Sequence, residues 1–90
     1  MAVRECYVYM VRCRDGSLYT GWTFDPERRL HEHNSGSGAK YTRSRRPVEL
    51  VYLERVESRQ RALVREREIK SLARASKQGL VRKSAMHSQS

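Results

Sequence analysis

The chain of 90 residues is one small domain by size, and its 19 Lys and Arg against 10 acidic residues give a net charge of +9. That charge favours a nucleic-acid-binding protein over a merely soluble basic protein or one that binds anionic membranes. Two cysteines are too few for a disulfide scaffold, no segment is apolar enough to span a membrane, and the first ten residues lack a signal-peptide core. We therefore expect a cytoplasmic protein with reduced thiols.

The first predicted elements form a β-hairpin. Residues 5–12 are rich in Tyr and Val and predict a strand, and residues 17–23 predict a second strand. Between them, Asp15-Gly16 is a strong signal for a hairpin turn. We therefore expect two neighbouring antiparallel strands near the start of the chain.

The length of the hairpin loop decides whether Tyr9 and Tyr19 share a face of the sheet. A two-residue loop places Tyr9 opposite Trp22 and turns the two tyrosines to opposite faces, because side chains alternate along a strand. A three-residue loop over residues 14–16 places Tyr9 opposite Gly21 and makes the tyrosines diagonal neighbours on one face. The sequence is compatible with both loops, so a shared tyrosine site requires an odd-numbered loop or a bulge.

A short helix follows the hairpin. Asp25 is a good N-cap and Pro26 suits the first helical position, so this helix is expected to end near residue 33 or 34. The remaining predicted elements are a loop over residues 34–47, a strand over 48–56, a longer helix from residue 59 that breaks near 71–73, and a further helix to about residue 81.

This order of elements defines the expected fold class. It is α+β, with a three-stranded antiparallel sheet flanked by helices in the order β-β-α-β-α-(α). Residues 4–82 are expected to form one domain, and the polar tail, residues 83–90, is expected to be disordered.

Glu66 lies at an unusual place on the longer predicted helix. The apolar stripe that includes Ala62 and Ala73 ends at Glu66, and a basic stripe that includes Lys70 begins there. A carboxylate at this boundary is partly shielded from water and close to cations. The same spacing also fits an ordinary Glu that pairs with Lys70 or Arg59 along the helix.

Arg29 and His33 are four residues apart on the short helix and therefore share a face. Arg can bind a phosphate through two hydrogen bonds, and His can move a proton near neutral pH. The pair also fits a surface Arg and a His that the helix dipole favours. With Cys6 and Cys13, the histidines lack the short spacing of a zinc site.

Basic side chains gather in the loop before the third strand and on the helices after it. We expect them to follow a phosphate backbone and to give salt-sensitive binding with little sequence selectivity. The candidate nucleic-acid-binding residues are Lys40, Arg43, Arg45, Arg46, Arg67, Lys70 and Arg74.

Five motifs in order match one known pattern. They are Tyr7-Val8-Tyr9, Tyr19-Thr20-Gly21, Asp25 with Arg29 and His33-Asn34 at four-residue spacing, Ala62-Leu63, and Glu66 with Ile69-Lys70. Their spacing resembles the GIY-YIG nuclease superfamily, with "YVY" in the place of GIY and "YTG" in the place of YIG. The stretch "GAKYTRSRRPVELVY" is similar to the small single-domain bacterial branch of UPF0213 type. The likeness covers residues 4–82.

The resemblance implies a metal-dependent endonuclease that hydrolyses DNA phosphodiester bonds, with structure-selective DNA repair or recombination as its setting. It implies that Glu66 holds one divalent ion, Mg²⁺ or Mn²⁺, and that Arg29 binds the scissile phosphate. Tyr9 or Tyr19 would help to activate the attacking water, and His33 would assist proton transfer or orient a tyrosine. Because a free phenol has a pKa of about 10, it needs help to act as a base at neutral pH.

Three features depart from the superfamily pattern. Tyr7 stands where the first motif has glycine, and Trp22 follows Gly21 where several of these nucleases have lysine. Gly21 itself keeps its place as a structural motif residue. The 90 residues also include no separate DNA-binding domain, so we expect DNA that is branched or nicked as the partner, with a further protein for targeting.

Two alternatives to a nuclease remain open at this point. One is a nucleic-acid-binding module that has the same fold with little or no catalytic turnover, which the change at Trp22 motivates. The other is a basic RNA- or ribosome-associated protein, which the net charge alone motivates.

Overall fold

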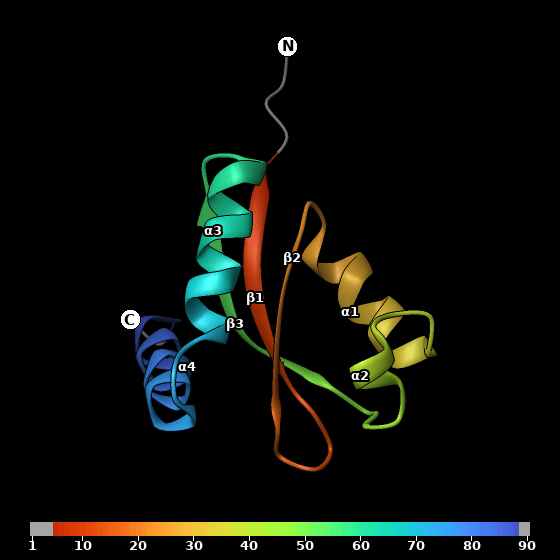
Figure 1. Ribbon diagram of the computed structural model, residues 1–90. Helices are drawn as coiled ribbons and strands as arrows, with labels where there is room; N and C mark the ends of the chain where they lie inside the picture. The colour runs from red at the N-terminus through yellow and green to blue at the C-terminus, as the bar shows by residue number, and fades with distance from the viewer. Residues whose placement is uncertain (1–4, 89–90) are drawn as a thin grey trace.

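The structure, a computed structural model, describes residues 5–88 and has the α+β fold that the sequence predicts. Three antiparallel strands form one sheet in the order β2-β1-β3, so β1 is the central strand (Figure 1). The elements are β1 (Cys6–Arg12), β2 (Leu18–Thr23), α1 (Pro26–Ser35), α2 (Lys40–Arg43), β3 (Glu49–Val56), α3 (Arg59–Lys70) and α4 (Arg74–Ser88). Within the described chain, no helix is both long and apolar enough to cross a membrane.

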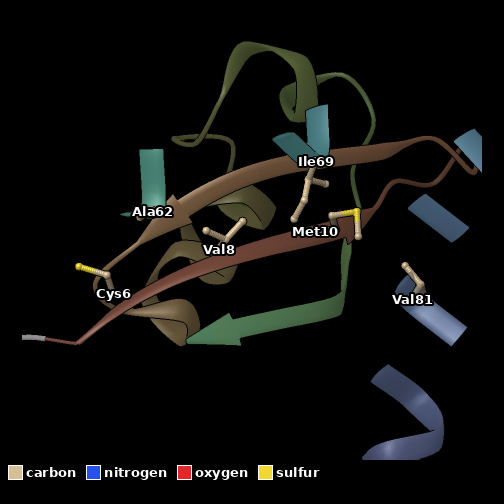
Figure 2. Packing of buried hydrophobic residues seen from close by; sticks show 6 residues of the cluster. All are labelled: Cys6, Val8, Met10, Ala62, Ile69 and Val81. Carbon is tan, nitrogen blue, oxygen red and sulfur yellow. The ribbon is translucent and has the colours of Figure 1, made fainter. Parts of the chain in front are cut away.

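Helices cover the sheet from two sides. In Figure 1, α3 and α4 lie on one side of the strands, and α1 and α2 lie on the other. Because β1 is central, its alternating side chains enter two separate apolar clusters, one on each face of the sheet. The first cluster comprises Cys6, Val8, Met10, Ala62, Ile69 and Val81 (Figure 2), and the second comprises Tyr9, Val11, Cys13 and Val48.

Local signals in the sequence set the starts of α1 and α3. The Asp25 side chain accepts a hydrogen bond from the backbone N–H of Arg28, and Ser58 does the same for Arg61. These caps satisfy N–H groups that would otherwise lack a partner at the helix start. α1 ends at Gly36, whose φ of +92° is the left-handed conformation common after a helix. Both predicted helix starts are confirmed.

α2 corrects the prediction of a loop over residues 34–47. This helix is only four residues long, and its N-cap, Ala39, makes no side-chain cap hydrogen bond. Such a helix is too short to show a periodic pattern and too short to be stable alone. Its one buried residue, Thr42, packs beneath α1. Tertiary contact therefore explains α2 better than local propensity.

The last helix is longer than predicted. α4 continues to Ser88, so residues 83–88 of the expected disordered tail are helical, and residues 89 and 90 lie outside the described part of the chain. The segment after Val81 contains no Pro or Gly that would end a helix. Leu80 and Val81 also pack against the first apolar cluster and hold the helix on the sheet.

Candidate active site

The hairpin loop turns Tyr9 and Tyr19 to the same face of the sheet. Tyr9 lies opposite Gly21, and Val11 lies opposite Tyr19. The Cys13 N–H donates to Ser17 O at 2.8 Å, and Gly16 has a φ of +86°. This is the three-residue loop with a left-handed glycine, one of the two loops that the sequence allowed.

Gly21 makes room for the Tyr9 ring. A Cβ atom placed on Gly21 would lie 2.6 Å from the Tyr9 hydroxyl oxygen and 2.8 Å from Cζ. The phenol of Tyr9 therefore lies directly across the backbone of the neighbouring strand. Any side chain at position 21 would displace the hydroxyl group.

His33 from α1 packs between the two tyrosines and is fully buried. Its Nε2 atom lies 2.8 Å from the Tyr9 hydroxyl oxygen, within hydrogen-bond distance. The Tyr19 ring meets the imidazole edge-on, with centroids 5.4 Å apart. On its other side, Tyr19 stacks on Tyr41 of α2, with centroids 5.8 Å apart. His33 thus contacts both of the tyrosines that the sequence singled out.

Two residues of this cluster were missed from the sequence, Tyr41 and Thr42. The Thr42 hydroxyl lies 2.8 Å from the second ring nitrogen of His33, Nδ1. It also donates to the backbone oxygen of Ala39 at 2.9 Å. Both residues belong to α2, whose four residues carry no periodic signal, so the sequence pattern offered no means of finding them.

Burial dominates the acid–base properties of the two tyrosines. Tyr9 is 2% exposed, and burial raises the pKa of its hydroxyl to about 12, although the Arg29 guanidinium beside it opposes the rise. Burial also raises the pKa of Tyr19, again against Arg29. For both phenols the neutral form is therefore the resting state near pH 7.

His33 is also held in its neutral form. Burial lowers the pKa of the imidazole, and the Arg29 charge lowers it further. A buried neutral imidazole has one nitrogen that donates and one that accepts a hydrogen bond. His33 can therefore accept a proton at the nitrogen that carries none.

Arg29 connects this buried cluster to solvent. Its side chain is 31% exposed, and its Nη1 atom lies 3.0 Å from Glu32 Oε1. It also lines a surface cavity of about 390 Å³ between the end of β2 and α1, together with Trp22 and Arg28. Asp25 and Glu32 line the same cavity, so an anion there would bind the Arg29 N–H groups that Glu32 does not engage. Trp22 packs against the α3 side of the sheet, on the face opposite to Tyr9 and Tyr19.

Glu66 reaches the site from the opposite side of the sheet. It lies on α3, its side chain is 20% exposed, and its charge raises the pKa of both Tyr9 and Tyr19. The nearest cation is Lys70, with Nζ 3.8 Å from Glu66 Oε1, so the helical pairing that the sequence allowed is present but long. The carboxylate is thus within electrostatic range of the two phenols.

The donor set around Glu66 fits Mg²⁺ or Mn²⁺ held largely by water. Among the described residues, no group of three or more His, Cys, Asp or Glu side chains could enclose a metal ion. Mg²⁺ commonly keeps several waters and needs only one or two carboxylates, so one partly exposed Glu is a suitable ligand. The same arrangement does not suit a structural zinc site.

The predicted basic residues divide into two groups. Three of them make contacts within the fold: Arg45 Nε lies 3.1 Å from Asp15 Oδ2, Arg46 Nε donates to Arg43 O at 2.9 Å, and Arg74 Nη2 donates to Gly16 O at 3.2 Å. Arg45 also stacks over the Tyr41 ring at 3.9 Å. These contacts join the hairpin loop to α2 and α4. The second group comprises the exposed Lys40, Arg43 and Arg67, together with Lys70, which is the ion-pair partner of Glu66.

Comparison with models of known protein families identifies the family of this chain. The model of the GIY-YIG catalytic domain matches residues 5–79. The chain belongs to the GIY-YIG family. The resemblance inferred from the motifs is thus confirmed over most of this GIY-YIG chain, and the domain is of a nuclease family.

Relatives of this GIY-YIG protein carry the name UPF0213 protein. One from Natronomonas pharaonis is 59% identical over 75 residues, which cover 83% of this chain and 88% of the relative. One from Staphylococcus saprophyticus is 53% identical over 75 residues, which cover 83% of this chain and 92% of the relative. The small single-domain form is therefore shared with these proteins.

Two solution structures have the same fold. The UPF0213 protein from Bacillus halodurans is 48% identical with a TM-score of 0.56, covering 86% of this chain and 82% of that chain. A protein from E. faecalis is 44% identical with a TM-score of 0.63, covering 93% and 90%. The GIY-YIG fold of this chain is thus similar to folds seen by NMR.

Proposed function

We propose that this GIY-YIG domain is a metal-dependent endonuclease that hydrolyses phosphodiester bonds in DNA. The observation that carries the proposal is the 2.8 Å contact between the Tyr9 hydroxyl and Nε2 of the neutral, buried His33. This contact gives the Tyr9 phenol a proton acceptor. Arg29 lies beside Tyr9 and offers N–H donors to an anion. The family membership supports the same reaction class.

The proton would move along a short route. Tyr9 takes a proton from the attacking water as its own hydroxyl proton passes to Nε2 of His33. The water oxygen then forms a bond to phosphorus as the bond to the leaving oxygen breaks, and the leaving oxygen departs with the bonding electron pair and takes a proton from solvent. His33 ends as an imidazolium ion, and Tyr9 ends as a neutral phenol. Tyr19 packs on the imidazole ring and limits its movement.

The pKa shifts of Tyr9 and His33 favour coupled rather than stepwise proton transfer. The pKa of Tyr9 is about 12, and that of His33 lies below its ordinary 6.5. Burial makes Tyr9 a weaker acid and His33 a weaker base, so complete transfer of the proton from Tyr9 to His33 before attack is unfavourable. The phenolate is therefore not a resting species, and the two protons move as the water attacks.

Two charged groups would act on the phosphate. Arg29 lines the surface cavity and can bind a nonbridging phosphate oxygen while it stays beside Tyr9. Glu66 would hold a divalent ion, Mg²⁺ or Mn²⁺, which stabilises charge that develops on the phosphate oxygens. Exposed Lys40, Arg43 and Arg67 would follow the DNA backbone.

The setting we propose is cytoplasmic DNA repair or recombination on branched or nicked DNA, with a further protein for targeting. The support is the net charge of +9 on one small domain, with exposed Lys40, Arg43 and Arg67 that offer phosphate contacts. Such a surface selects substrates by shape more than by sequence.

Replacement of one carboxylate tests the proposed activity. Supercoiled, branched and flapped DNA are incubated with Mg²⁺ and wild-type protein, Glu66→Gln, or the control Glu68→Gln on the exposed side of the same helix. We expect wild type and Glu68→Gln to cut and Glu66→Gln to bind DNA but cut at least about a hundredfold more slowly. Equal cutting by all three would show that the site is wrong or the activity is a contaminant.

A second candidate function is a nucleic-acid-binding module without turnover. The observation that favours it is the packing of Trp22 against the α3 side of the sheet, which leaves Arg29 as the cation that acts on Tyr9. In the same assay this candidate predicts that wild type and both variants bind DNA and none of them cuts.

A further inference from the structure

Thr42 forms a bridge between His33 and the backbone of α2. Its hydroxyl oxygen lies 2.8 Å from His33 Nδ1 and 2.9 Å from Ala39 O. Thr42 and His33 are both completely buried. A hydroxyl group has one hydrogen, so it can donate to only one of these two neighbours at a time.

Two arrangements of the hydrogens on Thr42, His33 and Tyr9 can be drawn. In the first, Thr42 donates to Ala39 O and accepts from His33 Nδ1–H, and His33 Nε2 accepts from the Tyr9 hydroxyl. In the second, Thr42 donates to His33 Nδ1, and Nε2–H donates to the Tyr9 oxygen. The two arrangements differ in the tautomer of His33 and in the direction of every hydrogen bond.

The Thr42 hydroxyl decides between them. In the second arrangement its oxygen would lie 2.9 Å from Ala39 O with no hydrogen between the two oxygens, although a carbonyl oxygen can only accept a hydrogen bond. At Tyr9, the described chain shows His33 as a hydrogen-bond acceptor, whereas Arg29 can only donate. The first arrangement gives each hydroxyl and ring hydrogen an acceptor, as buried polar groups require.

The backbone of the same segment closes around the ring. A Cβ atom on Gly38 would lie 2.5 Å from His33 Nδ1 and 2.8 Å from its Cα atom. The absence of a side chain at position 38 lets the chain run directly beside the imidazole into α2. Residues 38–42 thus hold the Nδ1 side of His33, while Tyr9 lies on the Nε2 side.

We infer that Thr42 is a positioning residue that keeps His33 in the tautomer with the proton on Nδ1, so that Nε2 is the acceptor for the Tyr9 proton. Thr42 acts through His33 and need not touch the substrate. The tautomer is a property of the folded protein, and only its effect on cleavage rests on the proposed nuclease function. Thr42 thereby sets the direction of proton transfer, from the Tyr9 hydroxyl to His33 Nε2.

Long-range ¹H–¹⁵N NMR of the His33 ring tests the inference without any substrate. In the folded wild-type protein near pH 7.5, we expect Nδ1 to carry the proton and Nε2 to carry none. Thr42→Ser keeps the hydroxyl and should keep this tautomer. Thr42→Val removes the hydroxyl and should shift the population toward protonated Nε2.

Thr20→Val is the matched control for loss of a buried threonine hydroxyl. Thr20 is 3% exposed, and its hydroxyl has no hydrogen-bond partner within the described chain, so this change should leave the tautomer of His33 as in wild type. A wild-type spectrum with the proton on Nε2 overturns the inference, even if Thr42→Val does not fold. An unchanged tautomer in folded Thr42→Val also overturns it.

Cleavage separates this inference from the proposed function. If the domain is a nuclease, we expect Thr42→Val to cut about tenfold more slowly and Thr42→Ser to restore most of the rate, in line with loss of general-base assistance. The predicted tautomer in a protein that cuts no DNA would refute the nuclease function and leave the inference intact. Normal cutting with the proton on Nε2 would support the nuclease function and refute the inference about Thr42.

Discussion

Tyr9 lies across the backbone of Gly21, with the phenol oxygen 2.6 Å from the point that a side-chain carbon at position 21 would occupy. This contact follows from the register of β1 and β2, in which the two residues are directly opposite. It places the Tyr9 hydroxyl at His33 and fixes the geometry of the whole proposed site.

Gly21→Ala is expected to disable the site. The added methyl group must push the Tyr9 ring away, which breaks its contact with His33 and overpacks a buried strand. We expect cleavage to fall by at least about tenfold and the free energy of unfolding to fall by about 1–3 kcal/mol. Plasmid cleavage and urea denaturation measure the two effects.

Gly79→Ala is the matched control for this change. Gly79 lies in α4, and a Cβ atom placed there has no neighbour within 4 Å. Alanine favours a helix over glycine, so this variant should cut normally and gain about 0.5–1 kcal/mol in the free energy of unfolding. A Gly21→Ala variant that behaves like Gly79→Ala would contradict the close packing of Tyr9.

His33 should make the stability of the protein depend on pH. Its pKa is about 6.5 in the unfolded chain and lower in the folded protein, chiefly because it is buried. Below pH 6.5 the unfolded state therefore binds more protons, and stability must fall as the pH is lowered. We expect the free energy of unfolding to decrease below about pH 6.5 and this contribution to level off below the folded pKa, by about 1.4 kcal/mol per unit of pKa lowering.

Urea denaturation between pH 5.5 and 7.5 measures this effect, and an NMR titration of His33 gives the folded pKa. His31→Gln, on an exposed part of the same helix, is the control and should retain the fall in stability. An opposite slope, with higher stability at lower pH, would mean that the folded protein prefers a charged His33.

DNA binding should weaken steeply as salt rises, because the contacts we propose are mostly between cations and phosphates. Each lost phosphate contact is expected to reduce the slope of log K against log salt by about 1. Arg67→Ala should therefore weaken binding to all DNA sequences similarly and make the slope shallower. Fluorescence anisotropy over a range of salt concentrations measures both quantities.

Arg55→Ala is the control for the salt experiment. Arg55 is an exposed cation on β3 whose Nη1 atom lies 3.4 Å from Glu5 Oε1, so it is paired within the fold and is not among the predicted binding residues. We expect its loss to change the slope little. Equal effects of Arg55→Ala and Arg67→Ala would indicate attraction by net charge alone and no defined binding face.

The sequence by itself determined the strands, the starts of α1 and α3, and the family. Asp25, Pro26 and Ser58 act on the few residues beside them, so their effects can be predicted from local chemistry. The alternation of side chains also reduced the question of Tyr9 and Tyr19 to a choice between two loop lengths. Local rules could take that question no further, because both loops are common.

Only the tertiary structure decided the rest. It selected the three-residue loop, formed α2 beneath His33, brought Thr42 and Tyr19 against that ring, and stacked Tyr41 on Tyr19. It also engaged Arg45 and Arg46 in contacts within the fold. These features depend on contacts between segments far apart in the chain. A four-residue helix has no periodicity of its own, and the charge of an arginine does not reveal whether it binds its own fold or a phosphate.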